Sequence, residues 1–353
     1  MKCFEVMRIS NKSYRLVLLS LPVMVFLMTG FWTWDGLFTP MQLSPEGETY
    51  RIPEGAGLTS LADDLAATGL LSSSKLLSWY GRMTESDGAI KAGEYYLPTG
   101  MTPRQFLQKV RSGEVIQHQV TFLEGWLFEQ LLDWLHRQPG IDHQLYGLSA
   151  ADVMTRLQHS GESPEGRFFP DTYNYESGTS DVSILATAYK RMQKILADEW
   201  LLRAADLPFK TPYQALILAS IVEKESGLQT DRPRIAAVFI RRLVQGFRLQ
   251  SDPTVIYGLG SEFSGDLRRV DLEGNTPYNT YVHYGLPPTP ISNPSRAAIH
   301  ASLHPADASS LYFVARGDGT SQFSDTLAEH NEAVRKYQLD GGQKHGRRGA
   351  AEE

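Results

Sequence analysis

The hydrophobic pattern is clearest over residues 211–227, where it predicts a helix that is apolar on every side. Thr211 can serve as a side-chain N-cap, and Pro212 occupies the first helical position, where its missing N–H costs nothing. Almost every residue over 215–222 is apolar, so the helix should run through the centre of a domain. Gly227 is expected to end this helix in a C-cap position.

Two glutamates stand at the end of this apolar helix. Glu223 and Glu225 lie roughly 200° apart around its axis, so they cannot both face one cleft. One is expected to be a working acid and the other a structural partner, of Lys224 or of a nearby arginine. The partial negative charge at a helix C-terminus raises the pKa of a carboxyl, and an apolar wall raises it further. Such a carboxyl suits a general acid, although periodicity does not choose between the two glutamates.

A charge-free stretch near the N-terminus predicts a membrane anchor. Residues 16–34 are about as long as the ~20 residues that cross a bilayer. Basic residues precede the stretch and acidic residues follow it, so residues 1–15 should be cytoplasmic and the chain beyond the span extracytoplasmic. Residues 35–48 would then be a linker. A cleaved signal peptide is the alternative, but no small-residue cleavage site follows the apolar run.

The pattern over residues 49–113 predicts a small unit with the order strand, helix, helix, strand. The predicted strands are 49–52 and 92–98, and the second helix covers about 73–82. This βααβ layout resembles a LysM module, a fold associated with glycans that contain N-acetylglucosamine. A spacer without a ligand is the alternative.

A larger α+β domain is predicted over residues 114–340, built around the buried helix. It should open with a strand over 115–122 and an amphipathic helix over 127–135, and it should contain a helix over 232–244. The polar, glycine-rich tail 341–353 is expected to be disordered. The fold class expected for the whole chain is therefore α+β behind a single transmembrane helix.

Composition and charge exclude several kinds of function. The net charge of -6 argues against a nucleic-acid partner. Cys3 is the only cysteine, so neither an intramolecular disulfide nor a cysteine metal site can form. His300 and His304 have the spacing of two ligands on one helix face, but no acidic residue lies between them and Pro305 follows at once. We expect structural histidines there, with no metal and no cofactor.

Several loops of the larger domain combine aromatic rings with Asn, Gln and Asp. They fall within 165–173, 248–257 and 278–294. Sugar rings stack on aromatic side chains and their hydroxyls need polar partners, so these loops could form a glycan groove. Ordinary turn chemistry in proline-rich loops is the alternative for each loop alone.

The longest motifs of the chain carry a family resemblance. They read, in order, FFPDTYNY, IVEKES, RLQSDPTVIYGLG, YNTY, GLPPTPISNP and LYFVARGDGTSQFSDTLAEHN. Together they closely resemble the endolytic murein transglycosylases of the MltG (YceG-like) family. The resemblance implies that the second glutamate of the E-K-E segment, Glu225, is the catalytic acid. It also implies a set of candidate substrate-binding residues: Asp171, Tyr173, Glu223, Ser226, Gln250, Asp252, Tyr257, Tyr278, Asn279 and Asn293.

The resemblance also implies a reaction, a location and partners. The enzyme would cleave the bond between N-acetylmuramic acid and N-acetylglucosamine within peptidoglycan strands, leave 1,6-anhydro ends and thereby terminate glycan elongation. It would be anchored in the inner membrane with its catalytic domain in the periplasm, where peptidoglycan synthases (penicillin-binding proteins) would be its partners. A catalytically silent glycan-binding scaffold and a hydrolytic muramidase remain the alternatives.

Overall fold

A computed structural model describes residues 11–84 and 90–339, with side chains from residue 22 onward except 23, 27 and 339. Residues 1–10 of the predicted cytoplasmic segment, including Cys3, and the tail 341–353 lie outside the described residues. The chain divides into two compact units. Among the described residues, those up to 118 together with 176–178 form the first unit, and 119–175 together with 179–339 form the second. The division falls at residue 118, whereas the sequence placed it near 114.

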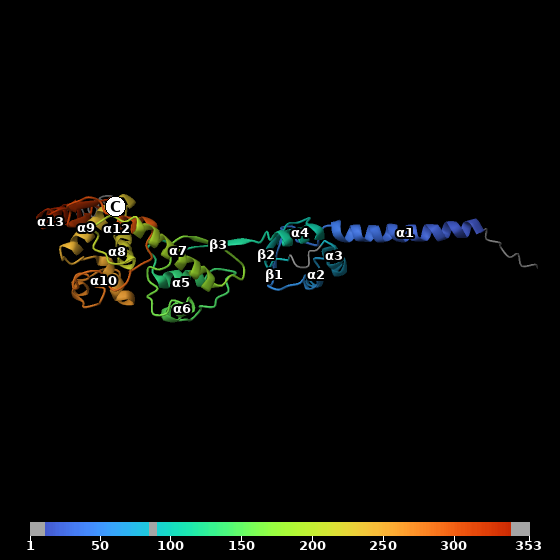
Figure 1. Ribbon diagram of the computed structural model, residues 1–353, viewed down its shortest axis with the longest axis horizontal. Helices are drawn as coiled ribbons and strands as arrows, with labels where there is room; N and C mark the ends of the chain where they lie inside the picture. The colour runs from blue at the N-terminus through green and yellow to red at the C-terminus, as the bar shows by residue number, and fades with distance from the viewer. Residues whose placement is uncertain (1–10, 85–89, 340–353) are drawn as a thin grey trace, which may run out of the picture. The chain divides into compact units, whose positions relative to one another are not determined.

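After a long N-terminal helix, the first unit contains a short antiparallel sheet and three further helices (Figure 1). Strand β1 (Glu48–Ile52) pairs with β2 (Gly93–Leu97), with Tyr50 opposite Tyr95. Between these strands come α2 (Leu58–Ala67) and α3 (Ser74–Met83), and α4 (Pro103–Ser112) follows β2. The βααβ order agrees with the order predicted from the pattern of apolar residues. The core of this unit is formed mainly by aliphatic and aromatic side chains of these elements, including Leu58, Leu65, Leu77, Tyr95 and Phe106.

Helix α1 (Asn11–Phe38) precedes the sheet and covers the whole of the predicted span. It has 28 residues and contains Pro22. Among the residues described, no helix is both long enough and apolar enough to cross a membrane. The membrane span over residues 16–34 therefore stays a prediction.

The second unit begins with a hydrophobic cluster formed by residues 120–189. Strand β3 (Gln117–Thr121) pairs with β4 (Thr172–Glu176), and three helices pack around the buried side chains of this segment. They are α5 (Phe128–His136), α6 (Ala150–Arg156) and α7 (Asp181–Leu201). Helix α7 contributes to two hydrophobic clusters of this unit. Its residue Tyr189 belongs to the cluster just described, and Met192 belongs to a second cluster that surrounds the next helix.

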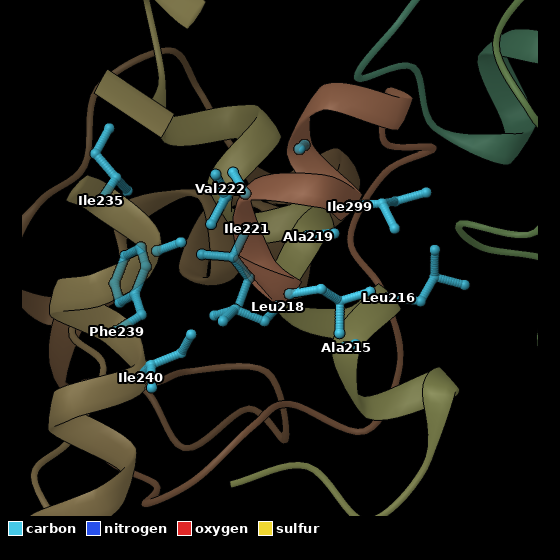
Figure 2. Packing of buried hydrophobic residues seen from close by; sticks show 14 of the residues in the cluster. Ala215, Leu216, Leu218, Ala219, Ile221, Val222, Ile235, Phe239, Ile240 and Ile299 are labelled. Atoms are coloured by element: carbon cyan, nitrogen blue, oxygen red, sulfur yellow. The ribbon is translucent and has the colours of Figure 1, made fainter. Parts of the chain in front are cut away.

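Helix α8 (Pro212–Glu225) forms the centre of the second cluster. Every residue over 215–222 is buried, as the sequence predicted, and Ser220 is the only polar residue among them. Figure 2 shows these side chains between α9 (Arg232–Val244), which contributes Ile235 and Phe239, and α12 (Arg296–Leu303), which contributes Ile299. Close packing on all sides explains why α8 has no polar face.

The predicted start of α8 is confirmed, whereas its predicted end is wrong. Thr211 caps the first turn, because its side chain accepts a hydrogen bond from the N–H of Gln214. The expected C-cap at Gly227 is wrong: the helix ends at Glu225, and its C-cap is Ser226 in extended conformation (φ −92°, ψ 111°). The Ser226 hydroxyl accepts a hydrogen bond from Arg232, and this tertiary contact makes a left-handed glycine unnecessary for ending the helix.

The remaining elements of the second unit complete the surroundings of α8. Helix α10 (Asp252–Leu259) and the short α11 (Arg269–Glu273) follow α9, and the antiparallel strands β5 (Tyr312–Ala315) and β6 (Ser321–Ser324) follow α12. Helix α13 (Leu327–Val334) and one π-helical turn, η3 (Arg335–Leu339), end the described chain. Three short 3₁₀ or π segments are present in the described unit, at Gln229–Asp231, Gly260–Glu262 and Arg335–Leu339.

Candidate active site

Glu225 lies at the end of α8 and lines an open cleft of about 580 Å³ in the second unit. The residue is half-buried, and burial raises the pKa of its carboxyl to about 7. Nearby groups adjust this value: the Ser251 hydroxyl and the Arg242 charge lower the pKa, whereas the Asp252 charge raises it. Glu225 is therefore a carboxyl that can hold a proton near neutral pH and still be reached from the cleft.

Ser251 holds the Glu225 carboxyl in place. Its hydroxyl donates to Oε1 of Glu225 at 2.6 Å, and the side chain is fully buried. The backbone N–H of Ser251 donates to Oγ1 of Thr280 at 3.0 Å, and Thr280 in turn shares a 2.8 Å hydrogen bond with Thr254. Three buried hydroxyl groups thus hold the turn that carries Ser251, and they orient the carboxyl with it.

Two further polar residues line the cleft beside Glu225. Asp252 accepts a hydrogen bond at 2.5 Å from the hydroxyl of Tyr281, which also lines the cleft. Gln250 adopts a left-handed backbone conformation with φ of 51°, and its N–H donates to the Thr280 carbonyl at 3.1 Å. A non-glycine residue in this region is uncommon, and here it places an exposed amide side chain in the cleft.

The far wall of the cleft comes from β5, β6 and the C-terminal helix. The Arg242 guanidinium donates to the carbonyls of Leu249 at 2.6 Å and Leu311 at 2.8 Å, so it connects the end of α9 to both neighbouring segments. His330 stacks on Tyr312 with ring centroids 5.2 Å apart, and burial lowers its pKa. The cleft thus offers aromatic rings beside amide, carboxyl and imidazole groups, which suits a carbohydrate.

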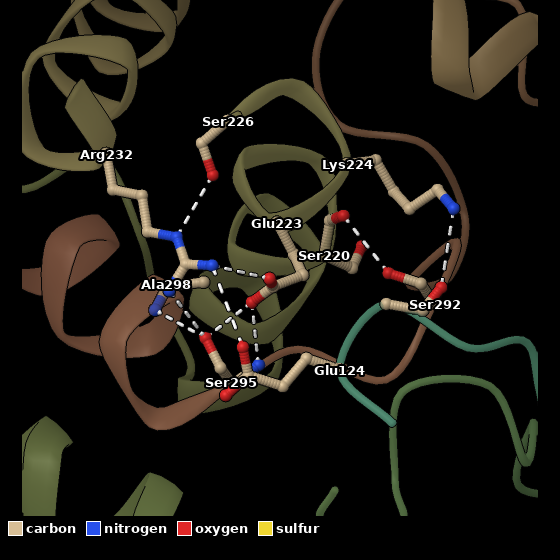
Figure 3. A network of polar contacts seen from close by, with 10 residues as sticks. Glu124, Ser220, Glu223, Lys224, Ser226, Arg232, Ser292, Ser295 and Ala298 are labelled. Carbon is tan, nitrogen blue, oxygen red and sulfur yellow. Dashed lines mark hydrogen bonds and ion pairs between the residues drawn. The ribbon is translucent and has the colours of Figure 1, made fainter. Parts of the chain in front are cut away.

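Glu223 lies in a different environment from Glu225 (Figure 3). Its carboxylate accepts from Nη2 of Arg232 at 2.8 Å and from the N–H of Ser295 at 2.8 Å. Both charged side chains are almost completely buried, at 5% exposure for Glu223 and 7% for Arg232. Arg232 also donates to the hydroxyls of Ser226 and Ser295, each at 3.0 Å. Glu223 is thus the structural partner of an arginine, one of the two options that the sequence left open.

The structure brings some of the predicted substrate-binding residues together at the cleft and places others elsewhere. Gln250 and Asp252 line the cleft with Glu225. Tyr257 and Tyr278 form a separate edge-to-face pair with centroids 4.7 Å apart. Glu223 and Ser226 belong to the Arg232 network.

The other four candidates make internal contacts. Asp171 pairs with Arg191, and Tyr173 is buried with its hydroxyl donating to the Phe169 carbonyl. Asn279 is buried and donates to the carbonyls of Leu272 and Gly274, while the buried Asn293 accepts from Phe168 N–H and donates to the Trp126 carbonyl. None of these four is among the residues that line the described part of the cleft.

Sequence reasoning missed several residues that surround Glu225. Ser251 lies between Gln250 and Asp252 in one quoted motif, and the Tyr281 hydroxyl belongs to the YNTY motif. Both residues therefore lie within motifs that the sequence analysis quoted, but a motif does not predict which of its side chains contact the catalytic carboxyl. Arg242 carries no such signal, because a basic residue in the last turn of a helix is common.

A second carboxyl with a raised pKa lies in the same unit. Glu165 is buried, and burial raises its pKa to about 7. The N–H of Phe128, the first residue of α5, donates to both of its oxygens, at 3.1 and 3.3 Å. The Tyr257 hydroxyl donates to Oε2 at 3.4 Å. Glu165 therefore joins the start of α5 to α10.

One group of side chains in the described chain has ligand atoms close enough for a metal ion. Glu199, His300 and His304 place these atoms within 4.8 Å of one another. The two Glu199 oxygens, however, accept from Arg296 at 2.7 Å and face Nδ1 of His300 at 2.8 Å. The two imidazoles stack in nearly parallel planes, 19° apart, and Nε2 of His304 already faces the Leu202 carbonyl at 2.7 Å. The contacts favour an ion-pair network at the C-terminal end of α12.

The chain is similar to a known protein family and to several characterised proteins. Residues 50–336 match the model of the YceG-like family. The endolytic murein transglycosylase of Bacillus subtilis strain 168 is 29% identical over 304 residues, which are 81% of this chain and 84% of that protein. The endolytic murein transglycosylase of Streptococcus pneumoniae D39 is 27% identical over 323 residues, covering 82% of this chain and 58% of that protein.

A solved structure is also similar. The YceG-like protein lmo1499 from Listeria monocytogenes, determined at 2.6 Å, matches with a TM-score of 0.52 at 30% sequence identity. The match covers 82% of this chain and 99% of that one.

Proposed function

Because the chain belongs to the YceG-like family, we propose that it is an endolytic murein transglycosylase that cleaves the glycan strands of peptidoglycan. The observation that carries the proposal is the Glu225 carboxyl. It lies on a cleft of about 580 Å³ and has a pKa of about 7, so it is available as a proton donor at neutral pH. The names of two relatives, which cover more than four fifths of this chain, support the same activity.

In the first step Glu225 acts as a general acid. The protonated carboxyl donates to the glycosidic oxygen between N-acetylmuramic acid and N-acetylglucosamine while the bond lengthens toward an oxocarbenium-like state. Ser251 donates to Oε1, so its hydrogen bond stabilises the carboxylate that remains after the proton has left.

In the second step the same carboxylate acts as a base. It accepts the proton of the muramic C6 hydroxyl, whose oxygen closes on C1 and gives a 1,6-anhydro end. One carboxyl serves both steps, because no water molecule has to be activated. Gln250, Asp252 and Tyr281 supply polar groups for the sugar hydroxyls in this cleft.

The proposal includes a location. The charge-free stretch 16–34, with basic residues before it, serves as a single-pass anchor in the inner membrane, with residues 1–15 in the cytoplasm. The catalytic unit then lies in the periplasm, where cleavage of new strands terminates their elongation beside the peptidoglycan synthases. The βααβ order of the first unit supports a LysM-like module next to the anchor.

Hydrolysis is a second candidate reaction, and one observation favours it. Asp252 lines the same cleft as Glu225, and its charge acts on Glu225. A muramidase needs a second carboxylate that activates water, separated from the acid by about 6.5–9.5 Å in inverting enzymes. Asp252 is the residue that would have this role.

Product analysis tests the proposal. The full chain in detergent is incubated with purified peptidoglycan beside its Glu225→Gln variant, and the products are analysed by mass spectrometry. Anhydro-ended fragments from the parent, with a rate at least about 10²-fold lower for the variant, would support the transglycosylase. Reducing ends would indicate the muramidase, and binding without cleavage by either protein would indicate a glycan-binding scaffold.

A further inference from the structure

The first unit has an exposed apolar face where α3 lies alongside the last turns of α1. A groove of about 370 Å³, here called the α1–α3 groove, is lined by Gly30, Thr33, Trp34, Leu37, Phe38, Trp79, Tyr80, Met83 and Thr84. Trp79 is 51% exposed and Met83 is 66% exposed. Large exposed apolar side chains gathered on one face indicate an interaction surface.

The two helices are packed together closely. A Cβ added at Gly36 would lie 2.4 Å from Cδ1 of Leu76, so glycine allows α3 to approach α1. Leu37 is buried, and the Phe38 ring stacks on Trp34 with centroids 4.4 Å apart. The position of α3 along the axis of α1 is therefore fixed by packing of side chains from both helices.

The position of the groove along α1 determines its depth relative to a membrane. Asp35 is the first charged residue after the apolar stretch, and Gly30 precedes it by five residues, or about 7.5 Å along a helix. The polar interface of one bilayer leaflet is about 5–7 Å thick, so residues 30–34 would cross it. Trp79 and Met83 line the groove with these residues and would lie at the same depth.

The composition around the groove fits a lipid interface. Phe31, Trp32 and Trp34 are all largely exposed on α1, and tryptophan is enriched at the membrane–water boundary. The cation of Arg104 on α4 flanks this face, because its guanidinium lies 5.5 Å from the centre of the Phe38 ring. Aromatic, apolar and basic groups together are typical of surfaces that bind an anionic membrane.

We infer that the face of α3 formed by Trp79 and Met83 docks into the outer leaflet of the bilayer that holds α1. The inference rests on the proposed membrane anchor. The first unit would then be held against the lipid surface at two points, α1 and α3, rather than attached by one helix alone. Its occupant is phospholipid, with the side chains of α3 at the level of the headgroups.

Lipid-attached quenchers test this placement. The full chain carrying Cys3→Ser has no other cysteine, so a single new cysteine can be labelled with an environment-sensitive fluorophore. Met83→Cys reports on the groove, Val25→Cys on the anchor, and Asp63→Cys on an exposed position of α2. Each protein is reconstituted in vesicles of phosphatidylethanolamine and phosphatidylglycerol that contain doxyl-labelled lipid.

Quenching at both 25 and 83, on the order of threefold greater than at 63, would support docking. Quenching at 25 without quenching at 83 would overturn docking and retain the anchor. Absence of quenching at both positions would overturn the anchor as well. A blue-shifted label at 83 that lipid quenchers do not reach would mean that protein, such as a second copy of the chain, covers the face, and docking would be overturned.

A variant pair adds a control for side-chain identity. Trp79→Ser beside the label at 83 should reduce quenching at least about twofold, because it removes the largest apolar group of the face. Leu201→Ser, which replaces a more exposed apolar residue of the second unit, should leave the quenching at 83 unchanged. Equal quenching in both variants would contradict the role assigned to Trp79.

Discussion

The hydroxyl of Ser251 donates a hydrogen bond to Oε1 of Glu225 across 2.6 Å. The donor is fully buried, whereas the acceptor lines an open cleft. Ser251 therefore contacts the Glu225 carboxyl from the protein interior, and the side of the carboxyl that faces the cleft is left for substrate. This hydrogen bond also couples two properties of Glu225, its orientation and its affinity for a proton.

The variant Ser251→Ala should change both properties. Because the hydroxyl stabilises the carboxylate and lowers the pKa of Glu225, its removal should raise that pKa. An acid that works in its protonated form then stays active to higher pH, so the alkaline limb of the kcat/KM profile should move upward. Loss of a hydrogen bond to a charged group should lower kcat on the order of tenfold.

The matched control for Ser251→Ala is Ser302→Ala on α12. Ser302 is equally buried and donates to the Ala298 carbonyl within its own helix. Its removal should leave the pH profile in place. A profile that does not move with Ser251→Ala would contradict the hydrogen bond to the acid.

The variant Asp252→Asn separates the two candidate reactions. The Asp252 charge raises the pKa of Glu225, so its neutralisation should lower that pKa and move the alkaline limb of the rate profile to lower pH. A transglycosylase should otherwise keep its rate within about tenfold, because Asn can still accept from Tyr281. A loss of 10²-fold or more, measured as release of fragments from peptidoglycan, would instead assign Asp252 as the base of a hydrolase.

The variant Glu223→Gln should be a stability variant. It leaves the Arg232 guanidinium buried without its charged partner, which costs about 3–5 kcal/mol in the free energy of unfolding. Glu124→Gln is the control, because this carboxylate lies 3.8 Å from the same guanidinium but is half exposed. The control should cost less than about 1 kcal/mol. Urea denaturation at constant pH measures both values, and equal effects of the two variants would contradict the role assigned to Glu223.

Stability should fall between pH 4.5 and pH 7. Burial raises the pKa of both Glu165 and Glu225 to about 7 in the folded chain, from an ordinary value of 4.5. The folded state therefore binds more protons than the unfolded state across this interval, and the stabilisation is lost as pH rises through about 7. Each group contributes on the order of 3 kcal/mol to this difference.

The variant Glu165→Gln should remove its share of the pH dependence. The neutral amide can still accept from the Phe128 N–H but cannot ionise, so the drop in urea midpoint between pH 5 and pH 8 should shrink. The exposed Glu332→Gln serves as control and should leave the drop unchanged. An unaltered drop in both variants would mean that Glu165 is ionised in the folded chain at pH 5.

The sequence predicted those helices and caps that depend only on residues close to one another in the chain. The boundaries of α9 at Arg232 and Val244 agree with the prediction, and so does the N-cap at Thr211, because caps and apolar periodicity are properties of neighbouring residues. The motif strings likewise led to the YceG-like family, which the family match confirms. The buried apolar run of α8 was predicted for the same reason.

What the sequence could not show depends on contacts between distant residues. Glu223 and Ser295 are 72 positions apart, and no periodicity indicates that the carboxylate accepts from the serine. Similarly, Tyr173 and Asn293 have side chains that suit a sugar, yet each satisfies a backbone group inside the protein. Polar side chains in loops serve both purposes, so only the tertiary structure separates them.

Helix α8 has one rotational setting, because side chains pack against it from all sides over residues 215–222. Advancing the helix by a single residue would turn every side chain by about 100°, which would carry Glu225 out of the cleft and Glu223 away from Arg232. The aliphatic side chains that pack around residues 215–222 thus determine the orientation of the acid at the end of the same helix. A site of this kind could be transplanted into another scaffold only together with the helices that pack against α8.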